Sequence, residues 1–147
     1  MNRTRLKVQL VKHEALRLKP YVDCCGRSWR DCTCTTKGNL TIGVGRNLDA
    51  SGIFDCEVQL MLDNDVITAW HACQRLMPGF DTFSEPRQHA FIDMAFNLGE
   101  PRLAKFKKML AAIEARDFET ARKEMLDSAW AKQVGPRAQT LANMVWP

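Results

Sequence analysis

Two carboxylates near the N-terminus, Glu14 and Asp23, have a spacing that could support acid–base chemistry. Glu14 ends a stretch with apolar residues at helical spacing, and a carboxyl group set against apolar surface holds its proton to higher pH. A protonated carboxyl group can act as a general acid while an ionised partner stabilises positive charge. Such a pair is suited to cleavage of a glycosidic bond. Two solvated surface charges would share this spacing, so the pair alone is a weak signal.

A glycine-spaced segment, LTIGVG at residues 40–45, follows these carboxylates. Its β-branched residues predict a strand, and the preceding GNL indicates a turn, so we expect a small hairpin. The hydroxyl of Thr41 both donates and accepts hydrogen bonds, which suits it to hold a water molecule. Arg46 and Asn47 come next, where they could bind sugar hydroxyls or cap the turn.

Helical periodicity accounts for most of the remaining chain. Residues 4–14 predict a helix with Leu6, Leu10 and Val11 on one stripe, and residues 56–77 predict the longest helix. Further helices are expected between Ser84 and Gly99, over 101–115, after Asp117 (DFETARKEMLDSAW), and through GPRAQTLANMVW. The sequence therefore predicts an α+β fold with its β part confined to about residues 21–50.

Composition places the chain among ordinary globular proteins. It has 147 residues, 46% hydrophobic and 26% charged, which suits one domain with a packed core. The net charge of +4 is compatible with an anionic partner without selecting one. The first residues alternate charged and apolar types, and no apolar run is long enough to span a membrane. We therefore expect synthesis in the cytoplasm, without the usual export signal and without membrane insertion.

Four cysteines gather in one segment, with the pattern C-C-x6-C-x-C over residues 24–34. Structural zinc sites typically use paired ligands with two to four intervening residues, so this spacing disfavours zinc, and no metal or cofactor is expected. Disulfides that tie Cys24 or Cys25 to Cys32 or Cys34 are the favoured interpretation.

Cys56 and Cys73 lie on one predicted helix. At a rise of ~1.5 Å per residue they are about 25 Å apart, which is too far for a disulfide. Cys56 could instead meet the cysteine-rich loop, and Cys73 is expected to be a buried apolar thiol. The residues Trp70, Trp130 and Trp146 have helical spacing and are expected in the core, whereas Trp29 lies in the loop.

The order of these motifs resembles the phage-type lysozymes, the family that includes the T-even phage lysozyme. In that family a Glu ends the first helix, an Asp follows nine positions on, and a Thr opens a TIGxG strand. Here those positions are Glu14, Asp23 and Thr41. The segments AFIDMAFNLGEPRLAKFKKML and DFETARKEMLDSAWAKQVGPRA are similar to the family's C-terminal helices. The resemblance runs from about residue 6 to residue 146.

The resemblance implies a single lysozyme-like domain. A hairpin lobe of about residues 15–55 and a linking helix of about 56–77 would precede a helical lobe of about 78–147, which would also include the N-terminal helix 4–14. The glycan would lie in the cleft between the lobes. Asn97 and Arg137 would bind it as hydrogen-bond donors. Alternatively, Asn97 could form hydrogen bonds at the end of its helix just before Gly99, and Arg137 could pair with a carboxylate near Glu14.

The resemblance also implies hydrolysis of peptidoglycan between N-acetylmuramic acid and N-acetylglucosamine. Glu14 would protonate the leaving oxygen, Asp23 would stabilise the sugar cation or orient water, and Thr41 would hold the attacking water. The family inverts the anomeric carbon, which requires carboxyl groups roughly 6.5–9.5 Å apart.

Two features depart from the family pattern. The connection between Asp23 and Thr41 is much longer than in the family, so Asp31 and Thr35 are alternatives for the second catalytic position. Asp23 is preferred because its spacing from Glu14 is kept. The strand ends GVGRN instead of the family's GxGH, which makes Arg46 a candidate for sugar binding.

The function expected from this resemblance is that of a monomeric phage endolysin. It would bind peptidoglycan and no nucleic acid, and would reach the periplasmic wall through a separate pore-forming holin. A lytic transglycosylase and a catalytically impaired glycan-binding module are the alternatives.

Overall fold

The computed structural model describes residues 1–146, and the chain divides into two compact units. Unit 1 comprises Met1–Val58 and unit 2 begins at Gln59, so that the division falls inside helix α3 (Asp55–Leu76). Unit 1 contains a small antiparallel sheet and unit 2 is helical, which confirms the α+β class. Among residues 1–146 no helix is long and apolar enough to cross a membrane. The assignment of helix 4–14 to the helical lobe stays a prediction.

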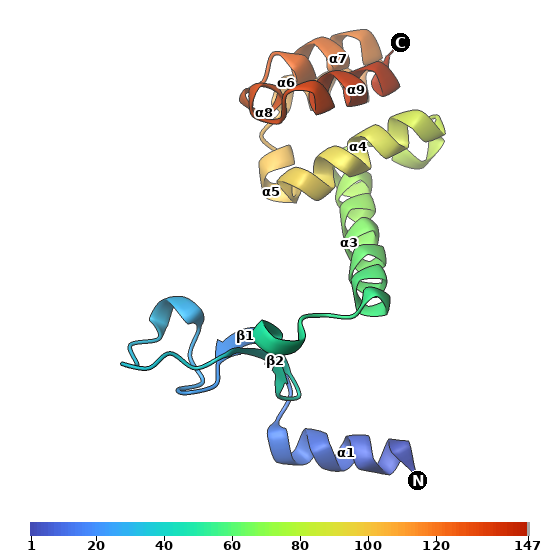
Figure 1. The fold of residues 1–147 in the computed structure, drawn as a ribbon. Coiled ribbons are helices and arrows are strands. Elements are labelled where there is room, and N and C mark those ends of the chain that lie inside the picture. Colours follow the sequence, from blue (N-terminus) through green and yellow to red (C-terminus); the bar gives the residue numbers. More distant parts are fainter. Residues whose placement is uncertain (147) are drawn as a thin grey trace. The chain divides into compact units, whose positions relative to one another are not determined.

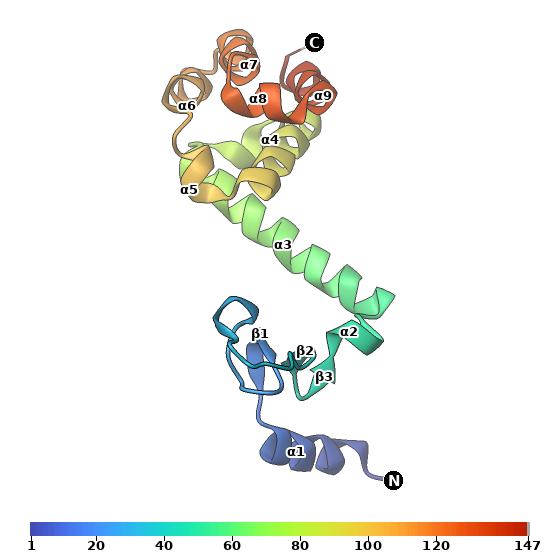
Figure 2. The ribbon, with the colours of Figure 1, turned by 60° about the vertical axis from the view of Figure 1, so that its left-hand side comes forward.

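Unit 1 begins with the expected N-terminal helix, α1 (Arg3–Glu14), which Asn2 caps by accepting a hydrogen bond from the Arg5 N–H at 3.0 Å. Strands β1 (Arg17–Val22), β2 (Leu40–Gly43) and β3 (Arg46–Asn47) form a sheet in that order, and the short helix α2 (Leu48–Ser51) follows. A 3₁₀ turn, Trp29–Asp31, lies in the loop between β1 and β2. Figure 2 shows this loop at the end of β1 that is remote from α1.

The sheet begins earlier in the sequence than the predicted hairpin, and the predicted strand is interrupted. It starts at Arg17 rather than near residue 21, because β1 pairs with β2 from Arg17↔Gly43 to Val22↔Leu40. The strand predicted over residues 40–45 ends at Gly43. Gly43 and Gly45 have φ angles of 68° and 75°, so the chain turns there before β3 begins.

Unit 2 holds the remaining helices among the described residues: α4 (Glu85–Leu98), α5 (Glu100–Leu103), α6 (Lys107–Glu114), α7 (Phe118–Leu126), α8 (Ala129–Val134) and α9 (Pro136–Val145). A 3₁₀ turn, Phe80–Thr82, precedes them. Helix α9 packs against α4, α7 and α8, as Figure 1 shows. These helices enclose a core rich in Phe and Met side chains, with Phe83 in edge-to-face contact with Phe80, Phe91 and Phe118.

Two segments that were each predicted as one continuous helix are each divided into two helices. The helix expected over 101–115 is interrupted between α5 and α6, where Phe106 N–H donates to Leu103 O and the chain turns so that Leu103 is buried. The helix expected after Asp117 is split at Ser128, whose hydroxyl caps α8 by accepting from Ala131 N–H. Asp117 caps α7 as predicted, and its pKa is lowered by hydrogen bonds from Thr120.

The tryptophan prediction holds for only one of the three helical residues. Trp130 is buried in the core of unit 2. Trp70 and Trp146 are 36% and 40% exposed, and the Trp70 indole donates to Asp81 at the surface. Trp29 is half-exposed in the loop, with the Lys37 ammonium 3.9 Å from its ring centroid.

Cys73 is expected to resist alkylation while the chain is folded. It is fully buried, as predicted, and this burial raises the pKa of its thiol to about 12. The thiolate is the reactive form, so at pH 8 almost none of it is available. Iodoacetamide should modify Cys73 only after unfolding in guanidinium, whereas Cys56, exposed on the same helix, should react in the native chain. Peptide mass spectrometry measures both, and equal native rates would contradict this prediction.

Candidate active site

Asp23 follows the last residue of β1 and is held in place by Asn39. The Asn39 backbone N–H donates to Asp23 Oδ1 at 2.9 Å, and the Asn39 side-chain amide donates to Oδ2 at 3.2 Å. The Asp23 N–H donates in turn to Asn39 O at 3.1 Å. Both carboxylate oxygens are therefore oriented by one residue, although each keeps further lone pairs for other partners.

Thr41 lies on β2 opposite Tyr21 and is only 4% exposed. Its hydroxyl donates to Asn39 O at 3.2 Å. Because the hydroxyl proton is used in this bond, its lone pairs are left to accept from a further donor such as water. Asn39 thus connects Asp23 and Thr41, and the structure brings these two predicted residues together.

Glu14 is the last residue of α1, and Ala15, with a φ of 59°, redirects the chain into β1. The Glu14 carboxylate lies beside the turn between β2 and β3, where a methyl group added to Gly45 would stand 3.5 Å from Glu14 Oε2. The side chain is exposed.

The β1–β2 ladder fixes the order of the three residues. Glu14 adjoins the end of the ladder near Gly43 and Gly45, and Asp23 lies at the other end beside Leu40. Thr41 is between them. At about 3.3 Å per residue, the ladder from Leu40 to Gly43 is about 10 Å long.

Asp31 and Thr35, the alternatives to Asp23, lie in the loop away from this ladder. Asp31 belongs to the 3₁₀ turn, and its carboxylate accepts a hydrogen bond from the Ser28 hydroxyl at 2.5 Å. Thr35 is exposed in an irregular segment. Of the three candidates, Asp23 is the one that the structure links to Thr41 through Asn39.

Two residues that sequence reasoning missed, Gly38 and Asn39, shape this end of the site. A methyl group on Gly38 would stand 1.9 Å from Asp23 Oδ1 and 2.7 Å from the Cys24 backbone nitrogen. Only glycine therefore lets the returning chain approach Asp23 this closely. The sequence signal for both residues was the GN pair, which indicated a turn but not that this turn would contact Asp23.

Arg46, the candidate for sugar binding, is occupied within unit 1. Its guanidinium forms an ion pair with Glu57 and lies 4.7 Å from the centroid of the Phe54 ring. The pKa of Glu57 is lowered by a hydrogen bond from the Phe54 N–H and then by Arg46. This arrangement supports the turn-stabilising interpretation of Arg46.

Asn97 lies near the C-terminal end of α4, in unit 2. Its side-chain oxygen accepts a hydrogen bond from the buried Trp130 indole at 2.8 Å, which leaves the Asn97 amide group free to donate. Asn97 therefore has a structural partner that sequence reasoning did not identify.

Replacing Asn97 with alanine is expected to lower the free energy of unfolding by about 1–3 kcal/mol, since the buried Trp130 N–H would lose its acceptor. Guanidinium unfolding followed by tryptophan fluorescence measures this. Asn97→Asp keeps an oxygen at the same place and should remain near wild type. Equal stability of Asn97→Ala and wild type would contradict the structural role.

Arg137 lines an apolar surface groove of unit 2. Its guanidinium donates twice to Asp93 Oδ1, at 3.0 and 2.7 Å, so its carboxylate partner is Asp93. The groove has a volume of about 430 Å³ and is lined by Leu62, Val66, His89, Ile92, Asp93, Phe96 and Arg137. Arg75 and Glu100 form a second ion pair of unit 2, and the Arg75 contact lowers the pKa of Glu100.

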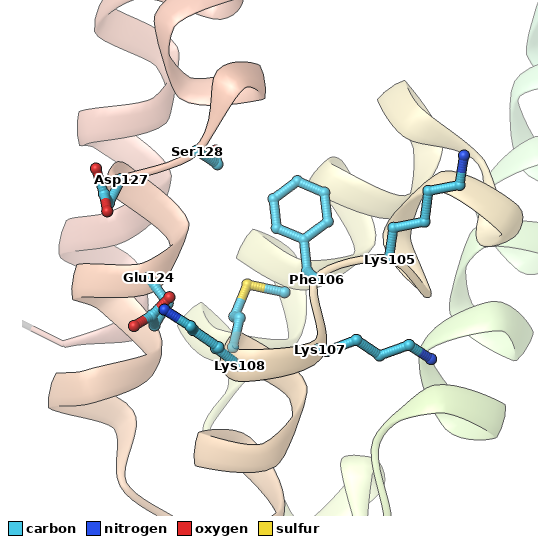
Figure 3. A pocket seen from close by; sticks show the side chains of 8 residues that line it. Lys105, Phe106, Lys107, Lys108, Glu124, Asp127 and Ser128 are labelled. Carbon is cyan, nitrogen blue, oxygen red and sulfur yellow. The ribbon is translucent and has the colours of Figure 1, made fainter.

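A second hollow of unit 2, of about 380 Å³, contains none of the predicted site residues. Figure 3 shows Phe106 facing the open space, with three lysines from the α5–α6 region and acidic residues from the end of α7 around it. Its lining residues are Lys105, Phe106, Lys107, Lys108, Met109, Glu124, Asp127 and Ser128.

All six cysteines are free thiols in the structure, so the expected disulfides are not formed in it. The Sγ atoms of Cys24, Cys25, Cys32 and Cys34 nevertheless lie within 4.8 Å of one another. Contact with the Cys24 thiol, followed by desolvation, raises the pKa of Cys34 to about 12. Cys56 is exposed and lies outside this group of four.

Comparison with known proteins places the chain within one family. The family model described as "Phage lysozyme" matches residues 11–144. The pre-baseplate central spike protein Gp5 of Enterobacteria phage T4 is 30% identical over 108 residues, which are 74% of this chain. The chain covers only 17% of the length of that relative. With a match over nearly its whole length, the chain belongs to the phage lysozyme family.

Proposed function

We propose that the chain is a muramidase that hydrolyses the β-1,4 bond between N-acetylmuramic acid and N-acetylglucosamine in peptidoglycan. The observation that carries this proposal is the arrangement of Glu14, Asp23 and Thr41 along one strand ladder, in a member of the phage lysozyme family. The proposal assigns the glycan as substrate and requires no cofactor.

The proposed mechanism gives each residue a role that its position supports. Glu14 protonates the leaving oxygen. Thr41, whose hydroxyl proton is directed to Asn39 O, accepts a hydrogen bond from the attacking water. Asp23, oriented by Asn39, stabilises positive charge on the sugar or directs the same water.

Inversion at the anomeric carbon is part of the proposal. Glu14 and Asp23 adjoin opposite ends of a ladder segment of about 10 Å, which is closer to the roughly 6.5–9.5 Å of inverting carboxyl pairs than to the roughly 5–5.5 Å of retaining pairs. Asn97 and Arg137 are proposed as further glycan contacts, through the free Asn97 amide and the exposed part of Arg137.

The test is product analysis with purified chain and isolated cell-wall sacculi. In water enriched in heavy oxygen, hydrolysis labels the new reducing end, which mass spectrometry detects. NMR of the first product gives its anomeric configuration, and the α anomer is expected for inversion. Unlabelled anhydro-sugars would instead identify a lytic transglycosylase, and glycan binding without products would identify a binding module.

The proposed biological role is host lysis by a monomer that reaches the periplasmic wall through a separate holin. Cells that express the chain in the cytoplasm should remain intact until chloroform permeabilises the inner membrane, and should then clear rapidly. Cells that express the Glu14→Gln variant should not clear. Lysis before permeabilisation would contradict the dependence on a separate pore.

A further inference from the structure

The loop between β1 and β2 gathers four thiols that the proposed reaction does not use. Their Sγ atoms all lie within 4.8 Å of one another, and those of Cys24 and Cys32 are 3.7 Å apart. We propose that Cys24, Cys25, Cys32 and Cys34 form a tetrahedral site for one zinc ion that holds this loop together. The inference concerns metal binding and does not depend on peptidoglycan cleavage.

The distances fit a tetrathiolate site. With Zn–S bonds of about 2.3 Å, the edges of a regular tetrahedron are about 3.8 Å long. The Cys24–Cys32 separation already has nearly this value, and the other thiol pairs need to contract by about 1 Å at most. A disulfide would require the paired sulfurs to move to about 2.05 Å and would not require four of them to meet.

The first two ligands come from a tight turn after β1. The N–H groups of Cys25 and Gly26 both donate to Val22 O, at 3.3 and 2.8 Å, and Gly26 adopts a φ of 67°. Arg17 steadies the turn by donating to Gly26 O at 2.7 Å. This turn lets the adjacent residues Cys24 and Cys25 direct their thiols to the same place.

The second two ligands come from the segment after the 3₁₀ turn. Cys32 has extended backbone angles, with φ −77° and ψ 116°. In an extended chain residues i and i+2 face the same side, so Cys32 and Cys34 can present both thiols to one ion. The four thiols can therefore meet at one ion despite the unusual C-C-x6-C-x-C spacing, because Cys24 and Cys25 use a tight turn whereas Cys32 and Cys34 use the segment that begins with the extended Cys32.

The ligand chemistry suits zinc better than Mg²⁺ or Ca²⁺. Four soft thiolates in tetrahedral geometry are typical of Zn²⁺, whereas Mg²⁺ and Ca²⁺ prefer oxygen ligands. As each Zn–S bond forms, the thiol releases its proton to solvent, and no electron is transferred. Since Cys24 directly follows Asp23, the ion would also fix the loop where it meets the proposed site.

The test measures zinc in the full chain. Protein purified with reductant and without chelator is expected to contain one zinc ion per chain by mass spectrometry of the metal. Co²⁺ should replace it with sulfur-to-metal charge-transfer bands, and X-ray absorption should show four sulfur neighbours at about 2.3 Å.

Matched variants separate the loop thiols from the others. Cys25→Ser and Cys34→Ser are each expected to weaken zinc binding at least 100-fold. Removing a residue that only hydrogen-bonds to a metal ligand already lowers metal affinity about 10–100-fold, and these substitutions remove a ligand itself. Cys56→Ser, an exposed thiol outside the group, should bind zinc like wild type. Protection of Cys73 from alkylation reports that unit 2 stays folded in every variant.

Two results would overturn the proposal. One is a reduced chain that shows no saturable binding at micromolar zinc, whether or not the isolated protein carries disulfides in the loop. The other is zinc binding that survives unchanged in both Cys25→Ser and Cys34→Ser, which would place the metal elsewhere.

Discussion

Replacing Glu14 with glutamine is expected to reduce the rate of peptidoglycan cleavage by about 100- to 10,000-fold, which is the usual contribution of a general acid. Glutamine keeps the length and shape of the side chain but has no proton to give to the leaving oxygen. The initial rate of turbidity loss in a sacculus suspension measures the effect. Binding to sacculi, measured by sedimentation, should change little, because the loss falls on the chemical step.

Glu114→Gln is a matched control for this substitution. Glu114 is likewise the exposed last residue of its helix, α6, and lies far along the chain in unit 2. This control should retain wild-type activity. A Glu14→Gln variant that cleaved the wall at the wild-type rate would remove Glu14 from the mechanism.

The Gly38→Ala variant is expected to lose about 1–3 kcal/mol of unit 1 stability, as overpacked sites do, together with most of its activity. The added methyl group would overlap Asp23 Oδ1 and the Cys24 backbone nitrogen. One of these neighbours is backbone and the other is held by Asn39, so neither can yield without disturbing the end of β1. Hydrogen exchange of the β1 and β2 amides and the rate of wall cleavage measure the two effects.

Thr36→Ala is the control for Gly38→Ala. Thr36 is exposed in the same loop, and its truncation removes atoms instead of adding them. It should match wild type in exchange and activity. Normal exchange and activity in Gly38→Ala would mean that the close approach to Asp23 is not needed.

The helices were the most predictable part of the fold. Apolar periodicity placed α1 and α3 within a residue of their observed ends, although α1 buries none of its side chains and α3 buries only Ala69, Ala72 and Cys73. The breaks at residues 104–106 and at Ser128 were missed. Both helix breaks depend on which side chains pack into the core of unit 2. Such tertiary packing is not encoded in the local sequence pattern.

The sequence named candidate site residues but not the contacts between them. Spacing from Glu14 favoured Asp23 and the family resemblance pointed to Thr41, and both assignments stay predictions. Asn39, which bonds to both, had no signal beyond a turn.

For the loop cysteines the sequence predicted that Cys24 or Cys25 would meet Cys32 or Cys34 in disulfides, but not that all four thiols would lie together. Rules of ligand spacing assume one kind of turn, whereas here a tight turn supplies two thiols and the segment that begins with the extended Cys32 supplies the other two.

The three hydrogen bonds between Asp23 and Asn39 have a consequence for how this chain can change over time. They join the two ends of the intervening segment directly, so the strands on either side can keep their register when residues are added in the loop between Cys25 and Lys37. The entropic cost of a longer connection rises by only about 0.6 kcal/mol for each doubling of its length. This loop is therefore a position where evolution, or protein engineering, could insert new sequence without moving β2.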